Sequence, residues 1–287
     1  MADPTHDASL PLMRSLDQDM RAFLQAAWIS QRFCSCRRNQ ESARPDLAFS
    51  RTLIQKTAHP GGRGADGALS MDFATARRKM VDNQVRPNEV TDLRLVAAML
   101  EIPRERFVPA DKAAMAYMDG NLALDEGGRF LLEPMVVGRL IQAADVKDTD
   151  HVLDVACGTG YSSAILARLA RSVVALEEDA NLADRAARLL KELGVDNAKV
   201  VGGPFSAGWS VEAPYDLILI NGAVEYLPES LLAQVKDGGR LVTIVGGAPI
   251  GKAMLYRNAS GDISSRTIFD ATAPVLPGFI KPKAFVF

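Results

Sequence analysis

The sequence of 287 residues has few of the features that mark secreted, membrane or metal-binding proteins. Its three cysteines are too few for a disulfide framework, and no group of histidines and cysteines has the spacing of zinc ligands. No apolar run approaches the ~18 residues of a membrane span. The N-terminus has neither the basic nor the apolar region of a secretory signal. We therefore expect a cytoplasmic protein with no membrane partner and no metal site.

An excess of charge of one sign is also absent. The chain has 33 basic and 35 acidic residues, a formal net charge of -2, whereas nucleic-acid-binding proteins usually carry a clear basic excess. We therefore expect no nucleic-acid partner. The contents of 48% hydrophobic and 24% charged residues are typical of a globular protein that buries a sizeable core.

The composition changes near residue 70. Residues 1–70 show no sustained periodicity and end in a glycine-rich stretch at 59–67, which predicts a disordered N-terminal extension. Two alternatives stay open: residues 20–33 form a partner-binding amphipathic helix, or Met71 is the true start of the protein. Residues 71–287 are expected to form the folded domain, with a helical part at 71–150 and an α/β core at 151–287.

The pattern after residue 71 alternates between helices and strands. We expect helices at 72–82, 91–100, 111–118, 134–145, 161–171, 181–193 and 228–236, and strands at 151–156, 172–177, 198–202, 215–221 and 240–245. Two antiparallel edge strands are expected at 253–258 and 283–287. This alternation predicts an α/β fold with a doubly wound, mostly parallel sheet and helices on both faces.

A glycine turn follows the first strand of the core. The apolar run Val152–Ala156 continues into Gly158-Thr159-Gly160, and a helix is expected to start at Tyr161. Glycine at such a turn lets a ligand approach the backbone closely. Ser163 stands where a dinucleotide-binding turn has its third glycine, so NAD is disfavoured.

An acidic residue follows at the spacing that a nucleoside site requires. Glu177 ends the second core strand, nineteen residues after Gly158. A carboxylate there can accept hydrogen bonds from both hydroxyls of an adenosine ribose. The turn and the carboxylate together indicate a nucleoside cofactor far more specifically than either feature alone.

These motifs resemble those of class I S-adenosylmethionine-dependent methyltransferases, and specifically the protein-L-isoaspartate O-methyltransferase family. The resemblance runs in order across about 71–246. Its segments are Arg86-Pro87, Ile102–Pro109, Asp154–Gly160, Gly208-Trp209, Ala213–Asp216 and Gly238–Val242.

The resemblance implies a function and a cofactor. Members of the family transfer a methyl group from S-adenosylmethionine to the carboxylate of an isoaspartyl residue in a protein or peptide, which begins repair. The residues that match its cofactor-binding positions are Asp154, Gly158, Thr159, Gly160, Tyr161 and Glu177, and Asn221 is a further candidate. The transfer requires alignment more than a general base, so catalytic residues stay open, with Arg129 and Asn221 as candidates.

Two segments depart from the family pattern. The third strand leads into Gly202-Gly203-Pro204, where the family has Gly-Asp-Gly with an adenine-binding aspartate. Gly128–Pro134 replaces the family's Gly-Gln-Thr-Ile-Ser-Gln-Pro, so Arg129, Phe130 and Leu132 stand in place of glutamine, threonine and serine. Two hydroxyls that hold the substrate carboxylate are thus replaced by apolar groups.

These departures leave three hypotheses for the function. The first is isoaspartyl methyl transfer, with Arg129 as a replacement donor to the carboxylate. The second keeps S-adenosylmethionine but changes the methyl acceptor, because Phe130 and Leu132 make that side of the pocket apolar. The third is a non-catalytic binding module. The sequence predicts no oligomeric state.

Overall fold

The computed structural model describes residues 72–125, 127–246 and 249–281, all within the compact unit Asp66–Phe287. The expected N-terminal extension at 1–70 and the expected strand at 283–287 lie outside these residues, so both stay predictions.

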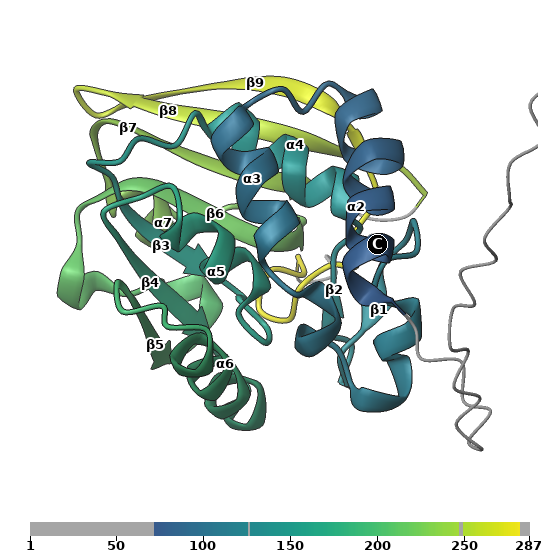
Figure 1. Ribbon diagram of the computed structural model, residues 1–287. Coiled ribbons are helices and arrows are strands. Elements are labelled where there is room, and N and C mark those ends of the chain that lie inside the picture. Colours follow the sequence, from purple (N-terminus) through teal and green to yellow (C-terminus); the bar gives the residue numbers. More distant parts are fainter. Residues whose placement is uncertain (1–71, 126, 247–248, 282–287) are drawn as a thin grey trace, which may run out of the picture. The chain divides into compact units, whose positions relative to one another are not determined.

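A seven-stranded sheet forms the centre of this unit (Figure 1). The strands follow one another across the sheet as β5 (Ala198–Gly202), β4 (Ser172–Glu177), β3 (His151–Val155), β6 (Tyr215–Val224), β7 (Val235–Val245), β8 (Gly251–Ala259) and β9 (Asp262–Ala271). Neighbours from β5 to β7 are parallel, whereas β8 and β9 are antiparallel. The predicted α/β fold with a mostly parallel sheet is confirmed.

The parallel strands are continuous apolar runs because both of their faces are covered. Along β3, Val152 packs into one core cluster, and Leu153 and Val155 into another on the opposite face. The other strands alternate in the same way, so each face of the sheet carries a core of its own.

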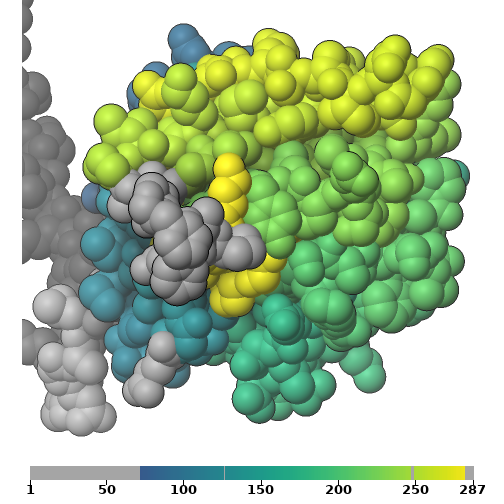
Figure 2. Space-filling view, turned by 180° about the vertical axis from the view of Figure 1, so that it is seen from behind, coloured from purple at the N-terminus to yellow at the C-terminus, as the bar shows by residue number. Residues whose placement is uncertain are grey.

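The two faces are covered differently. One core contains residues of α4 (Pro134–Ala144), α5 (Tyr161–Ala167) and α6 (Ala180–Glu192), with α2 (Phe73–Met80) and α3 (Leu93–Glu101) beside them. The other core is covered by the short α7 (Glu229–Leu232), by the 3₁₀ turn Phe205–Ala207, by Trp209, and by the C-terminal segment around Leu276 and Phe279. Figure 2 shows that segment in yellow on the back of the molecule.

Local sequence determines where α2, α3 and α6 begin. The side chain of Asp72 accepts a hydrogen bond from the Thr75 N–H, and that of Asp92 accepts one from the Arg94 N–H. Asp179 accepts two, from Asn181 and Leu182. These caps satisfy amide groups that have no partner within their helices. The predicted helix starts therefore agree with the structure to within two residues.

Four predictions of local structure differ from what the structure has. The helix expected at 161–171 ends at Ala167. The helix expected at 111–118 is a 3₁₀ segment, Ala110–Met115. The helix expected at 228–236 is the shorter α7, Glu229–Leu232, because β7 already begins at Val235. The partner of β8 is β9, which sequence analysis missed because Ile263 and its neighbours are exposed and lack apolar alternation.

The structure also contains short elements that the sequence did not predict. A two-stranded hairpin joins β1 (Leu122–Ala123) to β2 (Phe130–Leu131). The helix α2 continues as a π-helical turn, Val81–Val85, and a 3₁₀ turn, Arg86–Asn88. A further 3₁₀ turn spans Arg104–Phe107.

Candidate functional site

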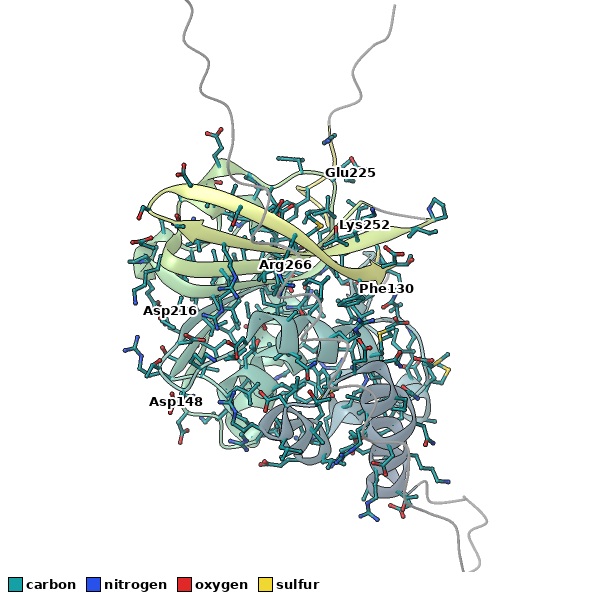
Figure 3. All side chains as sticks on the ribbon, turned by 90° about the horizontal axis from the view of Figure 1, so that it is seen from above. Phe130, Asp148, Asp216, Glu225, Lys252 and Arg266 are labelled. Carbon is teal, nitrogen blue, oxygen red and sulfur yellow. The ribbon has the colours of Figure 1, made fainter. Side chains whose placement is uncertain are left out.

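The predicted cofactor residues gather at the carboxyl end of β3. The strand order reverses there, since β4 lies on one side of β3 and β6 on the other. Ligands of open α/β sheets bind at such a point. Figure 3 shows Phe130 and Glu225 at this end of the sheet, with Asp148 and Asp216 marking the opposite end.

The glycine turn after β3 requires its glycines. Gly158 has φ +59° and Gly160 has φ +91°, in the left-handed region that side chains disfavour. A Cβ on Gly158 would lie 2.8 Å from Leu124 Cδ1, so the segment after β1 packs directly on this turn. A Cβ on Gly160 would lie 3.3 Å from Ala186 Cβ, so Gly160 is needed for packing on α6.

Glu177 lies at the centre of the site and is fully buried. Its Oε2 accepts a hydrogen bond from the Gly158 N–H at 2.7 Å and one from Arg129 Nη2 at 2.8 Å. Its Oε1 accepts the N–H groups of Glu178 and Asp179 at 3.1 and 3.3 Å. The glycine turn and the carboxylate predicted to act together are therefore in direct contact.

Asp154 is buried beneath the turn and is hydrogen-bonded on both oxygens. Ser162 and Ser163 donate to Oδ2 at 2.7 and 2.6 Å, and Asn221 Nδ2 donates to Oδ1. Burial raises the pKa of Asp154 to about 6, although these hydrogen bonds act in the opposite direction. Asp154 thus connects β3 to the first turn of α5 and to Asn221 on β6.

The remaining predicted cofactor residues are buried by packing. Thr159 donates its hydroxyl to the carbonyl of Phe107. The ring of Tyr161 contacts that of Phe107 edge to face, with centroids 5.4 Å apart. Cys157 is buried, which raises the pKa of its thiol well above the ordinary value. A thiol in that state is a poor nucleophile.

The β1–β2 hairpin, with Arg129 in its turn, covers the site through contacts with Glu177 and Gly158. Arg129 reaches Glu177, and its Nη2 also donates to the Ala156 carbonyl at 3.0 Å. Phe130 and Leu132 line a cavity of about 10 Å³ together with Leu124 and Asn221, so the predicted apolar side of the pocket is present. A cavity of that size holds about one water molecule.

Arg104 is an organising residue that sequence analysis did not single out. It is fully buried, and it donates to the carbonyls of Ala116 at 2.7 Å and Leu132 at 2.6 Å. Its guanidinium also lies over the Tyr161 ring, 4.9 Å from the centroid. Arg104 thereby fixes the strand that carries Phe130. The only sequence signal for this role was its place within the matching segment Ile102–Pro109.

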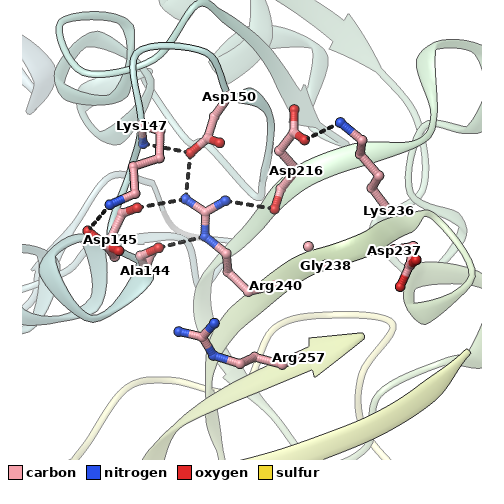
Figure 4. A pocket seen from close by; sticks show the side chains of 11 residues that line it. Ala144, Asp145, Lys147, Asp150, Asp216, Lys236, Asp237, Gly238, Arg240 and Arg257 are labelled. Carbon is pink, nitrogen blue, oxygen red and sulfur yellow. Dashed lines mark hydrogen bonds and ion pairs between the residues drawn. The ribbon is translucent and has the colours of Figure 1, made fainter. Parts of the chain in front are cut away.

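A second cavity, of about 280 Å³, opens at the amino end of the sheet (Figure 4). Its central residue is Arg240, which donates to Asp150 and to the carbonyls of Ala144 and Asp216. Lys236 bonds the Asp216 carboxylate at 2.7 Å. Because these polar groups already bond one another far from the glycine turn, we assign this cavity a structural role.

The described residues contain neither a candidate metal-binding cluster nor a helix able to span a membrane. Within 72–125, 127–246 and 249–281, no group of three histidine, cysteine or acidic side chains is placed to hold a metal ion. In the same residues, no helix has both the length and the apolar character needed to cross a bilayer.

Comparison with known sequences agrees with the geometry. Residues 75–270 match the family model described as "Protein-L-isoaspartate(D-aspartate) O-methyltransferase (PCMT)". The chain is 36% identical to protein-L-isoaspartate O-methyltransferase 2 of Shewanella sediminis over 189 residues, 66% of this chain and 75% of that protein. It is 35% identical to the Roseiflexus castenholzii protein-L-isoaspartate O-methyltransferase over 209 residues, 72% of this chain and 95% of that protein.

Solved structures show the same fold. A protein-L-isoaspartate O-methyltransferase structure superposes with a TM-score of 0.62 at 25% identity, covering 70% of this chain and 66% of that one. A Plasmodium falciparum chain solved with S-adenosyl-L-homocysteine superposes with a TM-score of 0.60 at 19% identity, covering 70% and 97%. With a family model matched over most of its length, this chain belongs to the protein-L-isoaspartate O-methyltransferase family.

Proposed function

We propose that this protein transfers a methyl group from S-adenosylmethionine to the carboxylate of an isoaspartyl residue in a protein or peptide. The observation that carries the proposal is the contact between Gly158 and Glu177 at the carboxyl end of β3, in a chain of this family. That contact brings the glycine turn and the buried carboxylate into one nucleoside site.

The residues of the site fit the cofactor in chemical type. Glu177 would accept the ribose hydroxyls, and the turn from Gly158 to Gly160 would lie along the methionine part. Gly203 and Trp209 lie side by side, with 3.7 Å between a Cβ on Gly203 and the indole, and would border the adenine. Asn221, held by Asp154, would face the methionine end. When bound, S-adenosylmethionine would supply a methyl group attached to a sulfonium sulfur. Once the methyl group is transferred, that sulfur is the neutral thioether of S-adenosylhomocysteine.

The chain's own contribution is positioning. A carboxylate acceptor is ionised at neutral pH, so one of its oxygens forms the bond to the methyl carbon as the carbon–sulfur bond breaks, and no proton moves. Rate enhancement then depends on alignment of the two reactants and on exclusion of water. The buried walls formed by Leu124, Leu132 and Tyr161 suit that task.

The acceptor side determines the substrate preference. Phe130 and Leu132 present apolar surface where hydroxyls were expected from the family pattern, which leaves Arg129 as the donor for the acceptor carboxylate. We expect a protein or peptide acceptor. The absence of nucleic-acid and membrane partners and the cytoplasmic location remain predictions from composition.

Methyl transfer from labelled S-adenosylmethionine to an isoaspartyl peptide tests the proposal. The same peptide with a normal aspartyl linkage serves as the acceptor control, and equilibrium dialysis measures cofactor binding in the same sample. We expect transfer to the isoaspartyl peptide alone.

Each other outcome has a defined meaning. Cofactor binding without transfer to either peptide would contradict isoaspartyl specificity and favour another acceptor. Lack of binding to both S-adenosylmethionine and S-adenosylhomocysteine would contradict an enzymatic role.

The double variant Phe130→Thr/Leu132→Ser restores the two hydroxyls. It is expected to lower KM for the isoaspartyl peptide by about tenfold, the value of one hydrogen bond to a charged group.

A further inference from the structure

Arg129 occupies the place in the site where a ribose would be expected. Its side chain is 6% exposed, its Nη2 lies 2.8 Å from Glu177 Oε2, and its guanidinium lies over the Phe205 ring at 4.8 Å from the centroid. It is a residue of the β1–β2 hairpin, 48 positions before Glu177 in the chain. Its position is therefore a product of tertiary packing.

The carboxylate of Glu177 has no acceptor capacity left. A carboxylate offers about four acceptor positions. Here the N–H groups of Gly158, Glu178 and Asp179 use three, and Arg129 uses the fourth. The three backbone donors belong to the turns that follow β3 and β4. A ribose hydroxyl can therefore bond Glu177 only by replacing Arg129.

The guanidinium itself is incompletely bonded in this position. Arg129 Nε and Nη1 are buried and have no hydrogen-bond partner among the described residues. Buried donors without partners are costly, and a guanidinium is best satisfied by a carboxylate bound through two nitrogens. The N–H groups of Nε and Nη1 point in different directions, so a carboxylate held through two nitrogens must use Nη2, which Glu177 occupies. Arg129 can therefore bind the acceptor carboxylate in this way only after it leaves Glu177.

The hairpin couples this residue to the glycine turn. The Leu124 N–H donates to the Arg129 carbonyl at 2.8 Å, and the Leu124 side chain packs on Gly158. Leu124 also lines the neighbouring cavity of about 10 Å³, which neither Arg129 nor Glu177 lines. Since a hydrogen bond joins Leu124 to Arg129, we expect the two residues to move together when the cofactor enters.

We propose that Arg129 is a latch that couples cofactor binding to acceptor binding. The ribose and Arg129 are alternative partners of Glu177, so the cofactor displaces the guanidinium, which then binds the acceptor carboxylate. Binding is consequently ordered, with the cofactor first. This inference rests on the proposed function, because it takes both the cofactor and the carboxylate acceptor from it.

Calorimetric titration of S-adenosylhomocysteine separates the latch from a structural role. We compare the full-length protein with Arg129→Gln, which has the family's residue at this position, and with Arg168→Gln, which removes an exposed ion pair to Glu101. Arg129→Gln should bind S-adenosylhomocysteine about tenfold more tightly, since the competitor for Glu177 is weakened. Arg168→Gln should bind it as the unmodified protein does.

The coupling is measured with the isoaspartyl peptide. In the unmodified protein, saturating S-adenosylhomocysteine should tighten peptide binding by about tenfold or more, and the peptide should tighten S-adenosylhomocysteine binding by the same factor. In Arg129→Gln this coupling should disappear, and KM for the peptide should rise about tenfold with kcat little changed. A merely structural role would weaken cofactor and peptide together.

The outcomes distinguish the two proposals. If the unmodified protein binds S-adenosylhomocysteine and Arg129→Gln binds it equally or less tightly, the latch is wrong. If neither protein binds it, the proposed function is wrong. Should Arg129→Gln fail to fold, Arg129→Lys retains the charge near Glu177 but cannot bind a carboxylate through two nitrogens. It should then show a raised peptide KM, and an unchanged KM would overturn the proposal.

Discussion

The amide of Gly158 donates a hydrogen bond to Glu177 Oε2 at 2.7 Å, across nineteen positions of the chain. Adjacent parallel strands produce this contact, since β3 and β4 are in register from His151 opposite Ser172 to Val155 opposite Leu176. The turn that leaves β3 and the carboxylate that ends β4 are therefore at the same height. The nineteen-residue spacing between Gly158 and Glu177 therefore corresponds to the register of β3 and β4.

Replacement of Glu177 by glutamine is expected to weaken S-adenosylhomocysteine binding by about 1.5–3 kcal/mol through the loss of charged hydrogen bonds. It also leaves Arg129 buried without its partner, which should lower the free energy of unfolding by about 3–5 kcal/mol. Calorimetry and denaturant unfolding measure the two effects. Glu178→Gln, an exposed neighbour, is the control. Unchanged binding by Glu177→Gln would disprove the ribose role of this carboxylate.

Gly158→Ala is expected to be more destabilising than Gly194→Ala. Both glycines have nearly the same φ, +59° and +64°, so both substitutions carry the left-handed strain of about 1–2 kcal/mol. A Cβ on Gly194 meets nothing within 4 Å, whereas one on Gly158 meets Leu124 at 2.8 Å. Thermal unfolding should show a larger loss for Gly158→Ala, and only that variant should lose cofactor affinity. Equal losses of thermal stability in the two variants would mean that the Leu124 side chain moves away from the added Cβ at no cost.

The buried carboxyl of Asp154 should make stability depend on pH. Its pKa of about 6 in the folded protein exceeds the ordinary value of 3.8, because burial disfavours the charged form. The folded state thus retains the proton to higher pH than the unfolded state. The stabilisation from this group is complete below about pH 4 and is lost as the pH rises through 6.

Denaturant unfolding at pH 4 and pH 7 tests this expectation. Between pH 4 and pH 7, the free energy of unfolding of the unmodified protein should fall by on the order of 3 kcal/mol more than that of Asp154→Asn. Asp148→Asn, which alters an exposed carboxylate, should follow the unmodified protein at both. Parallel behaviour of the unmodified protein and Asp154→Asn would show that Asp154 is not the titrating group.

The ion pair of Arg240 with Asp150 should affect stability and leave cofactor binding unchanged. The two side chains are 10% and 7% exposed, and Arg240 also bonds three backbone carbonyls. Arg240→Gln should therefore lower the free energy of unfolding by about 3–5 kcal/mol. Lys236→Gln removes a more exposed pair and should cost about 1 kcal/mol or less. A weakened S-adenosylhomocysteine affinity in folded Arg240→Gln would link this cavity to the site.

Much of the core could be predicted because its signals are local. Continuous apolar runs identify the strands buried on both faces, and capping residues such as Asp179 identify the helix starts. The edge strand β9 could not be predicted in this way. One side of the β8–β9 pair is open to solvent, and six consecutive residues of β9 from Asp262 are exposed. Its pairing is decided by the long β8 beside it, whose other edge pairs with β7.

The sequence by itself determined the alternation of strands and helices, the glycine turn and the carboxylate nineteen residues later. Each depends on neighbours in the chain or on the register of adjacent strands. Tertiary structure alone decided that Arg129 meets Glu177 and that Leu124 covers Gly158. The hairpin that carries Arg129 and Leu124 meets the turn only through tertiary contacts, because Leu124 packs on Gly158 and Arg129 donates to the Ala156 carbonyl. Local sequence preferences do not specify which carboxylate an arginine will pair with. That pairing depends on how segments distant in the chain pack together.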